Sequence, residues 1–380
     1  MGGHDDLPPE AFACALAGLP RMGPSRLTAL LDAVPPAVAW ARVENGSSWS
    51  ERGVLEALGS SRATILADWR KAAVDADVPQ VWDRVVDGDI GVALHGGAGY
   101  PPALADDVEP PMLVLHRGDP QVIDGPRVAV VGTRRCTATG AGVAFELGRE
   151  LAAQGVAVVS GLASGIDGAA HRGVLAAEAA PPIGVVGSGL DVVYPPGQHR
   201  LWEAVASTGV LLSEAPMGAP PERWRFPARN RIIAALADVV VVVESHRRGG
   251  SLHTVDEADR RGIDVMVVPG SVRSAASRGA NDLLAEGRAP VRDVDDVLMA
   301  LGLSGSTRRQ RVDPRRPPAD GDRGVLEAVG WQASSLDQVA VRTGLPFPEL
   351  AGALDRLCAA NWVRRQGGWY ERVAAGDADD

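Results

Sequence analysis

The stretch Arg127-Val128-Ala129-Val130-Val131-Gly132-Thr133-Arg134-Arg135 runs from a short apolar segment directly into a glycine and two arginines. Further short runs rich in Val, Ile and Leu lie at residues 156–160, 183–186, 210–213, 238–244 and 264–268. They show no clean alternation with polar residues, and helix-sized segments separate most of them. Strands of this kind form parallel sheets that are covered on both faces. With right-handed crossovers, they predict an α/β fold built on an extended Rossmann-like parallel sheet.

The segments before this sheet are interpreted as a helical domain followed by a connector. Helical patterns lie at 9–17, 28–32 and 54–73, and short strands at 91–94 and 112–116. The hinge from Gly18 to Gly23 opens a new helix, as in SAM-like and helix-hairpin-helix domains, and such a hinge can grip a phosphate. An ordinary tight turn is the alternative. The expected domains are therefore a helical one over 1–85 and the sheet domain over 86–303.

The segments after the sheet predict a linker and a winged helix. Residues 304–321 are rich in Pro, Gly and Arg, as linkers are, and an acidic tail ends the chain at 376–380. Helices are expected at 322–329, 336–342 and 347–360, and strands at 361–365 and 369–372 around the turn Gly367-Gly368. Three helices and a hairpin predict a winged helix over 322–373. Its recognition helix carries Glu349 and Asp355 against Arg356 alone, so a protein contact is expected before a DNA contact.

Composition limits the classes of function. The net charge is −10, from 38 basic and 48 acidic residues, so any nucleic-acid site must be a local basic patch. The three cysteines fit no metal site and no disulfide framework, which favours a reducing compartment. The N-terminus lacks a secretory signal pattern, and no apolar run is long enough to span a membrane. We expect a cytoplasmic protein without metal or cofactor.

Glycine-rich polar loops follow the predicted strands, and ligands of such sheets bind at the carboxyl ends of the strands. The first loop brings Arg134 and Arg135 to a helix start, which suits an anion. Residues 223–231 hold four arginines and two aromatic side chains. Arginines can hold phosphates, and an aromatic face can stack a base at roughly 1–3 kcal/mol. Ion pairs at the helix start are the alternative for Arg229 and Arg231.

Other chemistry finds less support. Asp167 and His171 share one helix face and could form a catalytic base with its orienting acid, or a structural hydrogen bond that pins loop to helix. The loop at Gly132 lacks the G-x-G-x-x-G fingerprint and the acidic residue that binds a ribose, so a dinucleotide is not expected. The phosphate-binding loop of nucleotide hydrolases and the serine nucleophile elbow are missing as well.

Several motifs occur in one characteristic order. They are Tyr100-Pro101, Val130-Val131-Gly132-Thr133-Arg134, Ser160-Gly161-Leu162-Ala163-Ser164-Gly165-Ile166-Asp167, Gly189-Leu190-Asp191, Tyr194-Pro195, Ser213-Glu214, Phe226-Pro227, Arg229-Asn230-Arg231-Ile232-Ile233, Gly250-Ser251-Leu252 and Pro269-Gly270. Jointly they resemble the bacterial DNA-processing protein A (DprA/Smf) family over about residues 90–290. The sequence departs from the family at Gly249 and Cys136, where serines are usual, and has Lys71 as its only lysine.

This resemblance implies a non-enzymatic, dimeric protein that binds single-stranded DNA in a basic pocket. It also implies that the protein protects DNA and assists loading of the recombinase RecA in recombination and natural transformation. Phe226 is the expected stacking residue. The other expected DNA-binding residues are Gly132, Thr133, Arg134, Arg135, Ser160, Gly161, Arg229, Asn230, Arg231, Gly250 and Ser251.

Two other functions remain open from the sequence. A nucleoside monophosphate hydrolase-like enzyme would use Glu214 or Glu244 as its acid, although the Gly-Gly-x-Gly-Thr loop of such enzymes is missing. A protein-binding adaptor would use the acidic surface and the winged helix.

Overall fold

The computed structural model describes residues 7–303, 317–331 and 333–373. These residues belong to two compact units that divide near residue 304. Most of the linker predicted at 304–321 lies outside the described residues, and so does the acidic tail predicted at 376–380.

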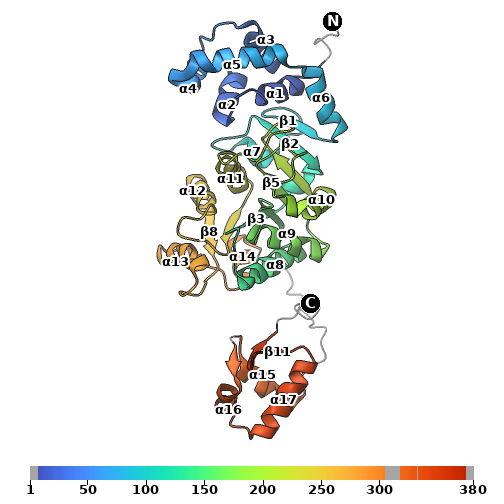
Figure 1. Cartoon of the computed structure of the whole chain (residues 1–380), viewed down its shortest axis with the longest axis vertical. Coiled ribbons are helices and arrows are strands. Elements are labelled where there is room, and N and C mark those ends of the chain that lie inside the picture. Colours follow the sequence, from blue (N-terminus) through green and yellow to red (C-terminus); the bar gives the residue numbers. More distant parts are fainter. Residues whose placement is uncertain (1–6, 304–316, 332, 374–380) are drawn as a thin grey trace. The chain divides into compact units, whose positions relative to one another are not determined.

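Helices open the first unit (Figure 1). They are α1 (Pro9–Ala17), α2 (Pro24–Ala33), α3 (Pro36–Asn45), α4 (Arg52–Leu58), η2 (Gly59–Ser61), α5 (Arg62–Asp75) and α6 (Val78–Asp87). Helix α2 begins at Pro24, which suits a first helical position because the amide there has no partner within the helix. The helical pattern at 54–73 corresponds to two α-helices, because Gly59 takes a φ of 58° and interrupts them.

One sheet of nine strands follows, in the order β1-β2-β6-β5-β4-β3-β7-β8-β9. The strands are β1 (Gly91–Leu94), β2 (Leu113–Gly118), β3 (Arg127–Val131), β4 (Ala157–Ser160), β5 (Pro182–Val186), β6 (Val210–Ser213), β7 (Val239–Val242), β8 (Asp264–Val267) and β9 (Ala289–Pro290). All neighbours from β6 to β9 run parallel, which confirms the predicted fold class. The strands of the connector extend this sheet as an antiparallel edge, and β9 was not predicted.

Helices cover both faces of the sheet, as the apolar strands predicted. Val128 and Val130 of β3 pack with α8, α9 and α14, whereas Ala129 and Val131 pack with α11, α12 and α13. The helical elements of this region are α7 (Pro102–Ala105), η3 (Pro120–Asp124), α8 (Ala138–Ala153), α9 (Ile166–Ala177), η4 (Pro196–Gln198), α10 (His199–Thr208), α11 (Arg225–Ala235), α12 (Leu252–Arg261), η5 (Ala275–Ser277), α13 (Arg278–Ala285) and α14 (Val294–Ala300).

The N-terminal helices share a core with the edge of the sheet. Leu16, Leu30 and Trp69 belong to the same apolar cluster as Leu115 of β2 and Trp202 of α10. The domain boundary predicted after residue 85 falls inside α6, and this cluster continues across it. The continuous core positions the α1–α2 hairpin against the sheet domain.

The second unit contains α15 (Asp320–Val329), β10 (Ser334–Ser335), α16 (Leu336–Thr343), α17 (Phe347–Ala359), β11 (Val363–Gln366) and β12 (Trp369–Arg372). Its strands pair in the order β10-β12-β11. Gly367 and Gly368 both take positive φ, as a tight hairpin turn requires. Arg356, the one basic side chain of α17, pairs with Asp322 at 2.6 Å. This unit is the winged helix that the sequence predicted.

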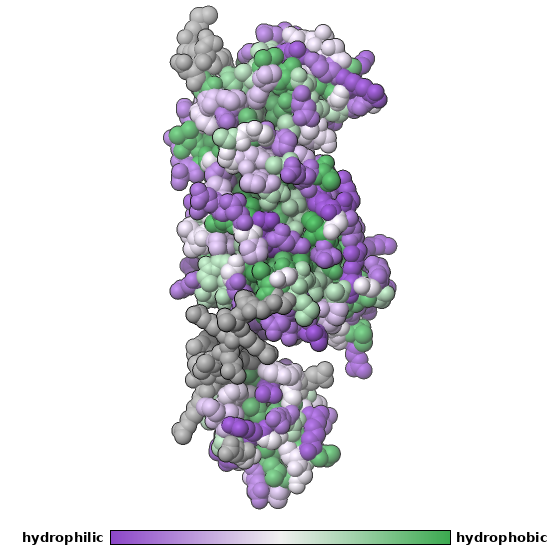
Figure 2. Space-filling view, turned by 180° about the vertical axis from the view of Figure 1, so that it is seen from behind, coloured by the Kyte–Doolittle hydropathy of each residue, from purple (hydrophilic) through white to green (hydrophobic). Residues whose placement is uncertain are grey.

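Hydrophilic and hydrophobic side chains are interspersed on the face of the first unit seen in Figure 2. No helix among residues 7–303, 317–331 and 333–373 is long and apolar enough to cross a membrane.

Candidate nucleic-acid interface

The loops at the carboxyl ends of the central strands surround an open cleft, here called the strand-end cleft. Its empty volume is about 1530 Å³. It is lined by Val131, Gly132, Thr133, Arg134, Arg135, Ala163, Asp167, Phe226, Pro227, Arg229, Asn230, Ile233, His246, Arg248, Gly249, Gly250, Ser251, His253 and Thr254. This lining contains four arginines and a single carboxylate, so the cleft is a basic site in an acidic chain.

The β3 loop is held rigidly, and this positions Arg134. A Cβ on Gly132 would lie 2.6 Å from the Ile166 side chain and 2.8 Å from the carbonyl oxygen of Glu244, so only glycine fits there. The amide of Thr133 donates to that same carbonyl oxygen at 2.7 Å. Because the backbone carbonyl of Glu244 contacts both Gly132 and Thr133, the loop presents its arginines from a fixed backbone position.

Arg134 and Phe226 form one unit within the cleft. The Arg134 guanidinium lies 4.8 Å from the centre of the Phe226 ring, a cation–π distance. Tyr194 packs against the same ring, with centroids 5.5 Å apart. These three residues also line an adjoining chamber of about 610 Å³ that shares Arg134, Arg135, Ala163, Phe226 and Arg229 with the cleft. Aromatic and basic groups thus lie together along one continuous depression.

Arg229 lies at the floor of the cleft rather than at its mouth. Its side chain is buried, and its Nη1 donates to the carbonyl oxygens of Gly161, at 2.9 Å, and Val185. Burial lowers the pKa of this guanidinium to about 10, partly offset by nearby Asp167, so Arg229 stays cationic at neutral pH. It provides a fixed positive charge at the floor of the cleft.

Arg231 lies outside the lining of the cleft and of its adjoining chamber. Its Nη2 donates to the Glu214 carboxylate at 2.5 Å and its Nη1 to the carbonyl oxygen of Glu109 at 2.8 Å. Both members of this pair are largely buried. For Arg231, the ion pair considered as an alternative from the sequence is what the structure shows.

The smaller predicted residues hold the loops together. Ser160 Oγ donates to the carbonyl oxygen of Val130 at 2.7 Å, and Ser160 itself is buried outside the cleft lining. Asn230 Nδ2 donates to the carbonyl oxygen of Gly250 at 3.3 Å. Ser251 Oγ donates to Ser245 Oγ at 2.9 Å, and Gly250 and Ser251 both line the cleft. Gly161 lines the adjoining chamber.

The structure adds residues that the predicted set lacked. Arg248, His246 and His253 line the cleft, and Tyr194 lines the chamber. Arg248 precedes the pair Gly249-Gly250, which could have marked it as an anion-binding residue. Its neighbour Arg247 precedes the same glycine pair, however. Only the structure separates them, because Arg247 pairs with Asp282 at 2.7 Å.

Asp167 makes the structural hydrogen bond that was one of the two alternatives for this pair, whereas His171 takes no part in it. Asp167 is buried and its Oδ2 accepts from the Gly161 amide at 3.2 Å, which pins the loop to α9. His171 is fully buried, and neither of its ring nitrogens has a hydrogen-bond partner among the described residues. The pair therefore shows no base-and-acid hydrogen bond.

We expect acid to destabilise the first unit through His171. Burial lowers the pKa of His171 from 6.5 to about 4. Between these pH values the imidazole is protonated in the unfolded chain and neutral in the folded chain. Stability should therefore be lost as pH falls from 6.5 towards 4, by up to about 3 kcal/mol. Urea unfolding at pH 7 and pH 5 measures this loss. His171→Leu should show a smaller loss than the parent chain, and equal losses would contradict the assignment.

Two family models match the chain. The family model for DNA recombination-mediator protein A matches residues 91–302, and the model for the DprA winged helix domain matches residues 309–368. The chain belongs to the DNA recombination-mediator protein A family. A relative in Mycobacterium tuberculosis, the putative DNA processing protein DprA, is 37% identical over 93% of this chain and 92% of its own length.

Solved structures of this family share the fold. The X-ray structure of DNA processing protein A from Streptococcus pneumoniae matches with a TM-score of 0.61 and 29% identity, over 77% of this chain and 96% of that one. The Helicobacter pylori protein matches with a TM-score of 0.51 and 30% identity, over 56% of this chain and 95% of that one. The Helicobacter pylori structure describes a single-stranded DNA binding mode of that family member.

Proposed function

We propose that the chain is a non-enzymatic protein that binds single-stranded DNA in the strand-end cleft. The observation that carries this proposal is the basic lining of the cleft, with Arg134, Arg135, Arg229 and Arg248 beside the aromatic ring of Phe226. Guanidinium groups hold phosphates, and an aromatic face stacks any base. The binding mode described for the Helicobacter pylori relative supports the same ligand here.

The cleft suits single-stranded DNA of any base sequence. Its charged groups suit the phosphates that all nucleotides share, and Phe226 offers a π-face rather than a hydrogen-bond code. The proposed contacts are the lining residues Gly132, Thr133, Arg134, Arg135, Phe226, Arg229, Asn230, Gly250 and Ser251, together with Gly161 of the adjoining chamber.

The enzyme alternative has weaker support, because both candidate acids are engaged elsewhere. Glu244 accepts from the Thr137 amide at 2.9 Å and from Thr137 Oγ1 at 2.7 Å, so it orders the start of α8. Glu214 pairs with Arg231. Neither carboxylate lines the strand-end cleft or its adjoining chamber.

The proposal extends to the cellular role. We infer that the protein acts as a homodimer in the cytoplasm, protects incoming single strands and helps to load the recombinase RecA onto them. The family description as a recombination mediator and the DNA-processing relatives support this role.

Salt dependence tests the electrostatic part of the proposal. Anisotropy titrations of labelled oligo-dT against the full chain should show affinity that falls with salt. Arg248→Ala should lower the slope of log K against log salt by about 0.7, the contribution of one phosphate contact on a single strand. Arg247→Ala is the matched control, since Arg247 pairs with Asp282 outside the cleft and should leave the slope unchanged. The proposal is wrong if oligo-dT fails to bind even at low salt.

A further inference from the structure

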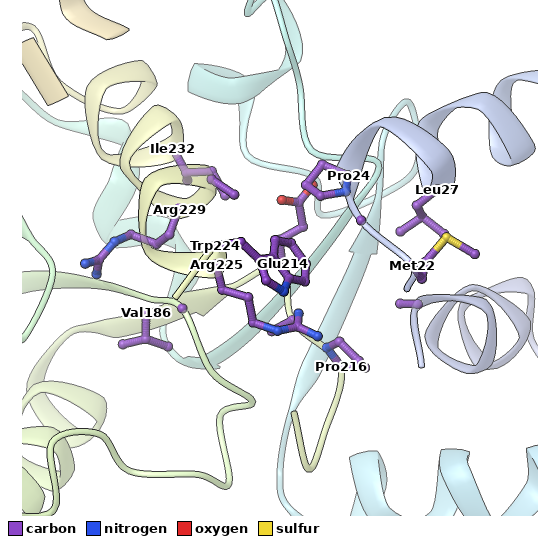
Figure 3. A pocket seen from close by; sticks show the side chains of 15 residues that line it. Met22, Pro24, Leu27, Val186, Glu214, Pro216, Trp224, Arg225, Arg229 and Ile232 are labelled. Atoms are coloured by element: carbon purple, nitrogen blue, oxygen red, sulfur yellow. The ribbon is translucent and has the colours of Figure 1, made fainter. Parts of the chain in front are cut away.

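A second pocket, here called the hairpin pocket, lies between the α1–α2 hairpin and the start of α11 (Figure 3). Its empty volume is about 460 Å³, and among its lining residues only Arg229 also lines the strand-end cleft. Met22 and Leu27 form apolar walls on the hairpin side, and Val186 and Ile232 on the sheet side. Ligand sites often occur where two parts of a fold meet and where apolar walls surround a few polar groups.

Trp224 gives this pocket an aromatic wall. The residue is 43% exposed, so part of the indole is accessible to a ligand. Two contacts hold the indole in place. Its Nε1 donates to Glu222 Oε2 at 2.9 Å, and the Arg225 guanidinium lies 4.5 Å from the ring centre. A fixed indole beside an apolar pocket favours a flat aromatic partner.

Glu214 gives the pocket its one carboxylate. Figure 3 shows this carboxylate pointing towards Pro24 on the hairpin. Its side chain is 13% exposed, and within the described part of the chain only its Oε1 has a hydrogen-bond partner, Arg231. The second oxygen is therefore available to a ligand that donates an N–H group.

We propose that the hairpin pocket binds a guanine base. A cationic ligand is disfavoured because Arg225 also lines the pocket, and an anionic one because Glu214 faces its interior. A neutral, planar ring with N–H donors satisfies both conditions. Guanine presents two adjacent donors, N1–H and its 2-amino group. They suit the available Oε2 of Glu214 and its neighbour Oε1, whose second lone pair can accept a bond beside that from Arg231. Thymine would instead place carbonyl oxygens on both sides of its single N–H, where the carboxylate repels them.

The base can come from a free nucleotide or from a DNA strand, and each source has its own measurement. Calorimetric titration of the full chain should show guanosine monophosphate binding at least about tenfold more tightly than thymidine monophosphate. In the DNA case, an oligo-dT with one internal guanine should bind more tightly than all-thymine DNA. A preference from either source supports the proposal.

Variants connect that preference to this pocket. Trp224→Ala and Glu214→Gln should each weaken guanine binding at least about fivefold, and Ala228→Leu should fill the pocket and abolish it. Binding of all-thymine DNA should stay unchanged in Trp224→Ala, since Trp224 lies outside the strand-end cleft. Trp331→Ala and Glu203→Gln are the controls, an exposed indole and an ion-paired carboxylate elsewhere, and should leave guanine binding unchanged.

The outcomes separate this inference from the proposed function. It is overturned if neither source prefers guanine, or if the preference persists in both Trp224→Ala and Ala228→Leu. Those two variants decide the matter even if Glu214→Gln fails to fold. Loss of oligo-dT binding would instead count against the strand-end cleft, and the nucleotide titration would still test the hairpin pocket.

Discussion

Replacing both Arg134 and Phe226 by alanine is expected to weaken oligo-dT binding by about a hundredfold. Losing the stacking ring costs roughly 1–3 kcal/mol, which corresponds to about 5- to 150-fold in affinity. Losing the guanidinium removes the proposed phosphate contact and a cation–π partner. Since the two side chains touch, their single effects should not add, and a double-mutant cycle should give a coupling of about 0.5–2 kcal/mol.

Anisotropy at constant salt measures these affinities, and RecA-dependent ATP hydrolysis on single-stranded DNA measures the downstream effect. If the proposed role in RecA loading holds, the parent chain should accelerate RecA assembly and the double variant should not. Arg134→Lys keeps the charge but loses the planar guanidinium with its paired donors. Its affinity for oligo-dT should therefore lie between those of the parent chain and Arg134→Ala. Arg52→Ala, whose side chain pairs with Glu56 on α4, should bind like the parent. If the double variant bound oligo-dT as tightly as the parent chain, single-stranded DNA would not bind in this cleft.

Arg231→Ala is expected to show the opposite pattern, with a large loss of stability and little loss of DNA affinity. It leaves the Glu214 carboxylate buried without its partner, which costs about 3–5 kcal/mol. The guanidinium does not line the strand-end cleft, so oligo-dT affinity should change less than about twofold where the chain is folded. Urea unfolding and anisotropy at low temperature measure the two quantities.

A double variant isolates the ion pair. Removing Glu214 together with Arg231 should restore part of the lost stability, because no lone buried charge then remains. If Arg231→Ala weakened DNA binding strongly and left stability intact, the residue would act on DNA as the family motif suggests, and the ion pair seen here would be secondary.

Sequence reasoning found the sheet and the loops around its strand-end cleft because both depend on local pattern. Continuous apolar runs predicted β3 to β8, and glycines beside arginines predicted the loops that surround the cleft. It did not find β9, which has only two residues, or the pairing of β1 and β2 with the main sheet. Such pairings depend on contacts between distant segments, which no local pattern encodes.

The segment from Trp224 to Arg231 shows which features the sequence alone determines and which depend on the tertiary structure. Its composition alone predicted a basic and aromatic binding element, and the ion-pair alternative placed a helix start there; α11 does begin at Arg225. Tertiary packing then directed Phe226 into the strand-end cleft, Trp224 into the hairpin pocket and Arg231 to Glu214. A helix turns by about 100° per residue, so neighbouring side chains point to different surroundings. Which surroundings they meet depends on the sheet and the hairpin packed around the helix, and only the folded structure supplies them.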